Sequence, residues 1–221
     1  IHQRNKAFTN AFIATLDTLP AEVTSWLSEN TQHCLNYAMG AAKLVLDRAR
    51  GVRGSSVVVA IARNGNECGV QLAGTGDQWF CAPSNTPSGY LFGNFTQADC
   101  QPDLGDSSIM EVIGVGGGAA GTATELNRMF GIDQHEANQD AQTQRSWFLS
   151  SNSWFTPSTS SSSSEYGIGL DARKVAQSNE DLLIHTGIAH RDGQSGWIGV
   201  GRVRAPRACF SDASRFLEES L

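Results

Sequence analysis

The sequence predicts an α/β protein of the mixed α+β type, in which a helical N-terminal segment precedes a mixed sheet with a β-hairpin and flanking helices. Three observations predict this class. Apolar residues recur at helical spacing through residues 1–50. An apolar run and its alternating return then flank Asn64-Gly65, a typical hairpin turn. From there to the C-terminus, short helical and strand patterns alternate, and we treat residues 1–221 as one domain.

The helical segment contains two apolar series. Pro20 separates them, because proline ends or begins a helix more readily than it continues one. The first series is Phe8, Phe12, Leu16 and Leu19, and the second is Val23, Trp26, Leu27, Leu35, Ala38, Met39 and Leu46. Gly51 and Gly54 follow Arg48 and Arg50, an order expected at a helix C-terminus.

The hairpin is predicted over residues 57–72. The run from Val57 to Ala62 is apolar and β-branched, as in a buried strand. We expect Arg63 and Asn64 at the tip, with Cys68, Val70 and Leu72 alternating on the return strand.

The remainder alternates between loops and short elements. Residues 74–106 are rich in glycine, proline, asparagine and aromatics, which indicates loops and short strands. Helices are expected over 119–130, 135–149 and 209–221, and buried strands over 182–184 and 197–203. Asp171 is expected to cap a short helix, and the serine-rich tract at 156–165 is expected to form a flexible loop.

Composition excludes several function classes. The net charge is −6 and the 16 Lys and Arg residues are scattered, so nucleic acid is not an expected partner. No apolar stretch reaches the roughly 18 residues of a membrane helix, so no membrane association is expected. The five cysteines fit neither a paired framework nor a zinc motif, which predicts reduced, mostly buried thiols and a cytoplasmic location.

An acidic cluster follows the loop region. Asp103, Asp106, Ser107 and Glu111 could bind Mg²⁺, accept a proton or hold a substrate amide. Capping of the following short helix explains the same residues equally well.

A glycine-rich turn comes next, at residues 114–121. Gly117 and Gly118 could present backbone N–H groups to an anion at the start of the following helix. The turn matches neither a phosphate-binding nor a dinucleotide-binding motif, and tight packing is an alternative reason for its glycines.

Two histidines mark the end of a predicted strand. His190 is suited to proton transfer, and Thr186 or the Gly187 amide could bind a carbonyl or phosphate oxygen. His185 and His190 point to opposite faces of a strand, so no metal site is expected. A lone histidine is, however, more often a hydrogen-bonded structural residue than a catalytic one.

Arginines complete the candidate set. Arg63, Arg202 and Arg204 carry planar cations suited to a carboxylate or phosphate, although each could equally lie on the surface.

Six segments, in order along the chain, resemble the YlbE-like bacterial proteins. They are His2-Gln3-Arg4-Asn5, Arg63-Asn64-Gly65, residues 74–83 (GTGDQWFCAP), Pro102-Asp103-Leu104-Gly105-Asp106-Ser107, Thr186-Gly187-Ile188-Ala189-His190 and Val203-Arg204-Ala205-Pro206. His185 stands where the family more usually has Asn, and residues 145–165 do not resemble it.

The resemblance implies an enzyme subunit of allantoin breakdown. Family members include subunits of oxamate carbamoyltransferase, which interconverts oxalurate plus phosphate with oxamate plus carbamoyl phosphate. This chain resembles the C-terminal half of the family. A second chain corresponding to the N-terminal half is therefore the implied partner. The resemblance also implies a higher oligomer and a small anionic substrate, with no cofactor.

The motifs and the resemblance together give the predicted site. The catalytic residues are His190, Asp106 and Glu111; the substrate-binding and anion-binding residues are Arg4, Asn5, Arg63, Asn64, Trp79, Ser107, Gly117, Gly118, Thr186, Gly187 and Arg204. Two alternatives stay open: a divergent enzyme that processes another amide or cyclic amide, and a non-catalytic subunit that completes a partner's active site.

Overall fold

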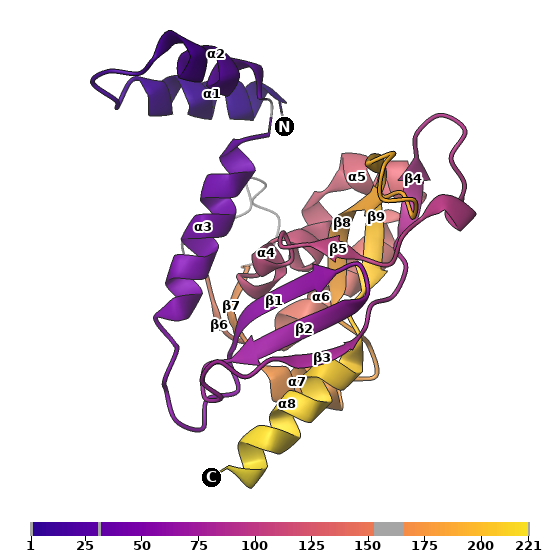
Figure 1. Cartoon of the computed structure of the whole chain (residues 1–221). Helices are drawn as coiled ribbons and strands as arrows, with labels where there is room; N and C mark the ends of the chain where they lie inside the picture. Colours follow the sequence, from indigo (N-terminus) through magenta and orange to yellow (C-terminus); the bar gives the residue numbers. More distant parts are fainter. Residues whose placement is uncertain (1, 31, 153–165, 221) are drawn as a thin grey trace. The chain divides into compact units, whose positions relative to one another are not determined.

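A computed structural model describes residues 2–30, 32–152 and 166–220 (Figure 1). The chain divides into two compact units, residues 1–44 and 45–221. Mixed helices and antiparallel sheets confirm the predicted fold class. The serine-rich tract predicted at 156–165 lies outside the described residues.

The first unit is helical. It contains α1 (His2–Ile13), α2 (Ala21–Glu29) and most of α3 (Cys34–Asp47). Buried Asn5 connects these helices, because its side chain donates to the Asn30 carbonyl at 3.0 Å and accepts from the Cys34 N–H at 3.1 Å. The rings of Phe8, Phe12 and Tyr37 cluster beside this connection.

The second unit contains three sheets. Their orders are β3-β2-β1-β5, β4-β9-β8 and β6-β7, and all the pairings within them are antiparallel. The strands are β1 (Val58–Asn64), β2 (Glu67–Leu72), β3 (Phe80–Pro83), β4 (Ser88–Leu91), β5 (Leu104–Gly105), β6 (Phe148–Ser151), β7 (Gly167–Leu170), β8 (Leu183–Ala189) and β9 (Trp197–Arg204).

Helices cover these sheets. The helix α8 packs on β2, β3 and α7, α4 packs on β1, and η2 packs on β8 and α6 (Figure 1). Their bounds are η1 (Gln97–Asp99), α4 (Ile109–Val112), η2 (Gly116–Thr122), α5 (Thr124–Phe130), α6 (Gln134–Ser146), α7 (Ala172–Gln177) and α8 (Arg207–Glu219). None of the helices in the described residues combines the length and hydrophobicity needed to cross a membrane.

The predicted hairpin is present as β1 and β2, with one difference at its tip. Asn64 forms the turn, since its Oδ1 accepts from the N–H groups of Asn66 and Glu67 at 2.9 and 2.7 Å. Gly65 has a φ of 85°, which explains the glycine. Arg63, however, pairs with Cys68 inside the hairpin and is buried. The alternation of a strand turns its side chain to the covered face of the sheet.

The strand around the histidines is longer than expected. Residues 186–189 were expected in a turn, but they continue β8, because Thr186 and Gly187 pair with Gly201 and Val200 of β9. A glycine is required at position 201 of β9, because a Cβ on Gly201 would lie 2.2 Å from the Ser88 carbonyl oxygen of β4. The helix predicted over 119–130 is divided between η2 and α5.

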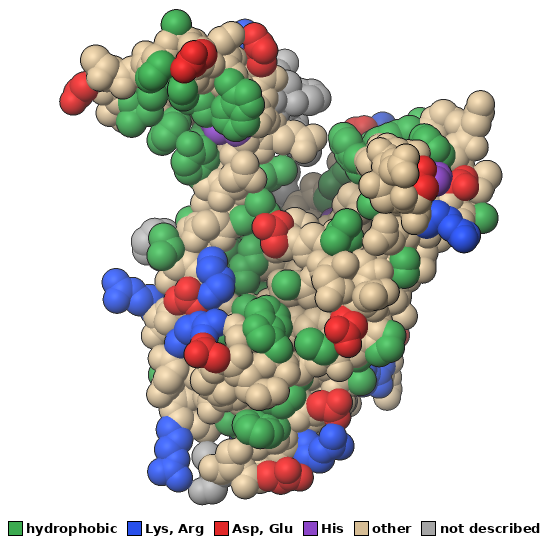
Figure 2. Space-filling model, in the orientation of Figure 1, with side chains coloured by type: hydrophobic (Ala, Val, Ile, Leu, Met, Phe, Trp, Pro, Cys, Tyr) green, Lys and Arg blue, Asp and Glu red, His purple; other side chains and the backbone are tan. Residues whose placement is uncertain are grey.

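All five cysteines are free thiols in the structure. Cys68, Cys100 and Cys209 are buried, Cys34 is half-buried and Cys81 is exposed. Acidic and basic side chains are intermixed over the second unit in Figure 2.

Candidate functional site

The centre of the candidate site is a buried ion pair between two sheets. Arg63 on β1 and Asp103, immediately before β5, are joined at 2.6 Å between Nε and Oδ2, and both side chains are almost completely buried. They meet because β5 pairs with β1 at Arg63. Burial makes such a pair costly to form and more costly to break on one side.

Every N–H donor of Arg63 has an acceptor within the protein. Besides Asp103, the guanidinium donates to the Gly105 carbonyl and the Ser108 hydroxyl at 2.7 Å each, and to the Thr186 hydroxyl at 3.1 Å. Thr186 in turn donates to Asp103 at 2.8 Å. An arginine carries five N–H groups, so no donor of Arg63 is left for a substrate in this structure.

A second buried group, Glu111 on α4, lies near the ion pair. Its Oε1 accepts from the backbone N–H groups of His185 at 2.9 Å and Gly117 at 3.4 Å. Burial raises the pKa of Glu111 to about 8, although these hydrogen bonds and the charge of Arg63 act in the opposite direction. The carboxyl group therefore holds a proton at neutral pH.

The glycine-rich turn closes around this carboxyl group. A Cβ on Gly116 would lie 2.2 Å from Glu111 Oε1, and a Cβ on Gly117 would lie 2.3 Å from the Leu183 carbonyl oxygen. The turn presents the Gly117 N–H group to a carboxyl oxygen of Glu111. The oxygen belongs to the protein itself.

His185, whose backbone N–H donates to Glu111, has a side chain that is uncharged at neutral pH. Burial, followed by the positive charge of Arg202, lowers the pKa of His185 to about 4. Its ring packs edge-on against Phe130, with 5.8 Å between the centroids.

The remaining predicted catalytic residues lie elsewhere. His190 follows the last residue of β8, so it is about 13 Å along the strand from Thr186. Its Nδ1 accepts from the Asp192 N–H at 3.1 Å, and its ring packs on Phe95. Asp106 is exposed beside half-buried Ser107. No contact among the described residues joins His190 to Glu111 or Asp106.

The predicted anion-binding residues are also divided among several places. Arg204 donates to Asp140 at 2.7 Å and to the Asp181 carbonyl at 2.9 Å. Asn5 belongs to the helical unit, and the side chain of Arg4 is outside the described part of the chain. Gly118 is buried near Gln144, and Gly187 is exposed next to Trp197.

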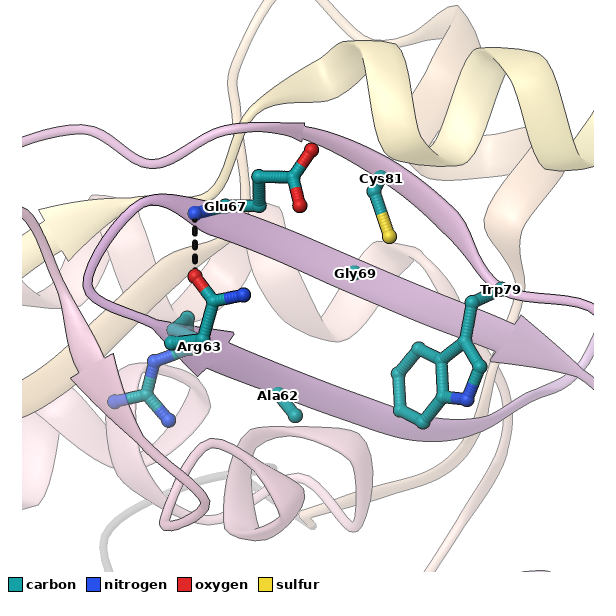
Figure 3. A pocket seen from close by; sticks show the side chains of 7 residues that line it. Ala62, Arg63, Glu67, Gly69, Trp79 and Cys81 are labelled. Carbon is teal, nitrogen blue, oxygen red and sulfur yellow. Dashed lines mark hydrogen bonds between the residues drawn. The ribbon is translucent and has the colours of Figure 1, made fainter.

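Three predicted residues do share an open pocket of about 200 Å³ on the sheet face (Figure 3). They are Arg63, Asn64 and Trp79, and the other lining residues are Ala62, Glu67, Gly69 and Cys81. In Figure 3 the Arg63 guanidinium points away from the pocket, toward β5. The other charged residue that lines the pocket is Glu67.

Sequence reasoning missed Ser108, Glu67 and Cys81. Strand alternation could have placed Glu67 and Gly69 on one face, but nothing local pairs Ser108 with Arg63. Within residues 2–30, 32–152 and 166–220, no group of three His, Cys, Asp or Glu side chains is arranged to hold a metal ion.

Comparison with known proteins defines the class: this is a chain related to the subunits of a carbamoyl-transferring enzyme. A family model described as oxamate carbamoyltransferase subunit AllG matches residues 1–107. The chain is 39% identical over 208 residues to the oxamate carbamoyltransferase subunit AllG of Escherichia coli K12, which covers 91% of this chain and 48% of that protein. The predicted family resemblance is confirmed: the chain is homologous to the AllG family.

Two further proteins are similar. The uncharacterized protein YahG of Escherichia coli K12 is 35% identical over 79% of this chain and 37% of its own length. A crystal structure of a conserved protein of unknown function from Enterococcus faecalis V583 has a TM-score of 0.84, with 28% identity over 99% of this chain and 54% of that one. The chain therefore spans about half the length of these relatives or less.

Proposed function

We propose that this chain is part of an enzyme that transfers a carbamoyl group between small anions, in the manner that the name of its AllG relative indicates. The finer proposal is the reaction implied by the resemblance. A phosphate oxygen bonds to the ureido carbon of oxalurate, and the bond from that carbon to the oxamate nitrogen breaks. The nitrogen takes up a proton, which gives oxamate and carbamoyl phosphate.

The observation that carries the proposal is that three of the described groups predicted to bind anions, Arg63, Arg204 and the Gly117 N–H, already donate to acceptors within the chain. Arg63 donates all five hydrogen bonds to protein acceptors, Arg204 pairs with Asp140, and the Gly117 N–H donates to Glu111. A substrate with a carboxylate and a phosphate needs further donors. This supports an active site shared with protein outside this chain. We propose a cytoplasmic location for that assembly as a separate expectation from the reduced thiols.

Glu111 is the proton donor that we propose first. Its pKa of about 8 keeps it protonated at neutral pH, and a general acid works best when its pKa is near the working pH. His190 and Asp106 remain further proposals for proton transfer, and they lie outside the Glu111 surroundings.

A second candidate is a non-catalytic subunit that holds a partner's active site together. The separation of His190 from Glu111 favours it, since general acid and base groups work when they surround one reacting bond. No observation in the structure favours the amide-processing alternative over these two.

The test is an assay of carbamoyl phosphate formation from oxalurate and phosphate, with the assembly purified from its source. The Glu111→Gln and His190→Ala substitutions are introduced, with Glu22→Gln as the control. Loss of turnover by about 100-fold or more in Glu111→Gln, with the assembly intact, supports a catalytic chain. Full activity of both substituted assemblies supports the non-catalytic candidate.

A further inference from the structure

The pocket on the sheet face has a floor of small side chains. Ala62 pairs with Gly69, and Gly69 pairs with Cys81, so the three stand opposite one another across β1, β2 and β3. Trp79 closes one end of the pocket. A Cβ on Gly69 would lie 3.0 Å from Trp79 Cε3, so the glycine is what lets the indole lie close to the sheet.

The other end of the pocket is negatively charged. Glu67 and Trp79 lie toward opposite ends in Figure 3, with Gly69 between them. Among the described residues, no hydrogen bond or ion pair of the Glu67 carboxylate is present. The charge of Arg63 is balanced by Asp103, and burial together with the charge of Glu67 raises the pKa of Cys81, which keeps that thiol neutral. An anion is therefore disfavoured here.

An aromatic face and an unpaired carboxylate together suit an alkyl cation. A guanidinium stacks on an indole through its flat face and binds a carboxylate with two parallel N–H groups. Glu67 precedes Gly69 by two strand residues, about 7 Å, which an arginine side chain spans. An ammonium group has no flat face to stack, so arginine suits this pocket better than lysine.

The size of the pocket indicates a side chain as the occupant. Its volume of about 200 Å³ is below the roughly 300 to 1,000 Å³ typical of small-molecule sites, and it is open to solvent. A partner chain is also expected on other grounds, because a relative of 39% identity is named as a subunit.

We propose that this pocket receives an arginine side chain of a partner chain, with the guanidinium held between the Glu67 carboxylate and the Trp79 indole. The inference rests on the proposed function, in which protein outside this chain completes the enzyme. It adds to that proposal one specific contact, between a partner arginine and the residues Glu67 and Trp79.

The first test uses the full chain and ethylguanidinium as a fragment of the arginine side chain. Ethylurea, which has nearly the same shape and no charge, is the matched probe. Titration is followed by the NMR shift of the Trp79 indole N–H. We expect saturable binding of ethylguanidinium, weakened at least tenfold by Glu67→Gln and unchanged by Glu22→Gln, an exposed residue of α2. Equal shifts from both probes, or no effect of Glu67→Gln, would overturn the proposal.

The second test asks whether the cation belongs to a partner. Glu67→Arg and the control Glu219→Arg, at an exposed residue of α8 in the same unit, are introduced into the natural assembly, and assembly is measured by native mass spectrometry. We expect Glu67→Arg to weaken assembly at least tenfold and the control to change it less than twofold. Intact assembly in Glu67→Arg rejects a partner arginine, even where ethylguanidinium binds.

The two tests also separate this proposal from the proposed function. If assembly depends on Glu67 but the assembly transfers no carbamoyl group, the pocket proposal is retained and the proposed function is rejected. If the Glu67→Arg variant assembles as tightly as the wild type and transfers the carbamoyl group, the pocket proposal is rejected and the proposed function is retained.

Discussion

Arg63 shows how one cation at a hairpin becomes part of the protein's interior. The side chain takes its acceptors from residues 40, 45 and 123 positions away in sequence, namely Asp103, Ser108 and Thr186. A motif that contains Arg63 and Asn64 gives no indication of those partners. Their assembly depends on the pairing of β1 with β5 and on the position of β8, which are tertiary features.

Removal of Arg63 should destabilise the protein strongly. We expect Arg63→Met to lower the free energy of unfolding by about 3 to 5 kcal/mol, because Asp103 is then buried without its partner. Urea unfolding followed by circular dichroism measures this change. The double variant Arg63→Met/Asp103→Leu should recover much of the loss. Equal losses in the single and double variants would contradict a paired role.

Glu111 provides a prediction of pH dependence. Its pKa is raised in the folded protein from 4.5 to about 8, so the unfolded chain releases this proton first as the pH increases. The stabilising contribution is complete below pH 4.5 and is lost as the pH rises toward 8. Glu111→Gln removes this dependence.

The measurement compares wild-type and Glu111→Gln unfolding at pH 5 and pH 9. We expect the difference in unfolding free energy to shift in favour of the variant by on the order of 3 kcal/mol at the higher pH. A pH-independent difference would mean that Glu111 is ionised throughout.

Among the elements, those with strong local signals were predicted best. The β1–β2 hairpin follows from an Asn-Gly turn between apolar runs. Asp171 caps α7 as predicted, because its side chain accepts from the Arg173 N–H at 2.9 Å. Gly131 ends α5 with a φ of 69°, as its position suggested. Each of these features depends on a few neighbouring residues.

The elements with non-local causes were predicted less well. The extension of β8 through Ala189 depends on its pairing with β9, and a small-residue pattern at Thr186-Gly187 does not contain that information. The free N–H groups of the glycine-rich turn were predictable from its sequence. The acceptor of the Gly117 N–H, buried Glu111, was not, because a glutamate is ordinarily exposed.

The glycine-rich turn gives a prediction that compares substitutions at two neighbouring glycines. Gly117→Ala should destabilise the protein by about 1 to 3 kcal/mol, since its Cβ would lie 2.3 Å from the Leu183 carbonyl oxygen. Gly118→Ala is the matched control, because its Cβ meets only Gln144 Nε2 at 3.9 Å. Thermal unfolding of the two variants should separate them clearly. Equal melting temperatures would show that the turn is not closely packed.

For the whole molecule, the sequence predicted the fold class and the family, and the site only in part. The helical unit exposes Phe8, Val23, Trp26, Leu35 and Tyr37, and hydrophobic side chains gather over it in Figure 2. The predicted catalytic residues His190 and Glu111 do not come together within the described chain. Both features agree with a protein that functions as one part of a larger assembly.

The most direct test of this account is the rate of carbamoyl phosphate formation from oxalurate and phosphate, measured for this chain alone and for the assembly purified from its source. We predict turnover by the assembly and none by the isolated chain, because Arg63, Arg204 and the Gly117 N–H already donate to acceptors within the chain. Turnover by the isolated chain at the rate of the assembly would contradict a shared active site.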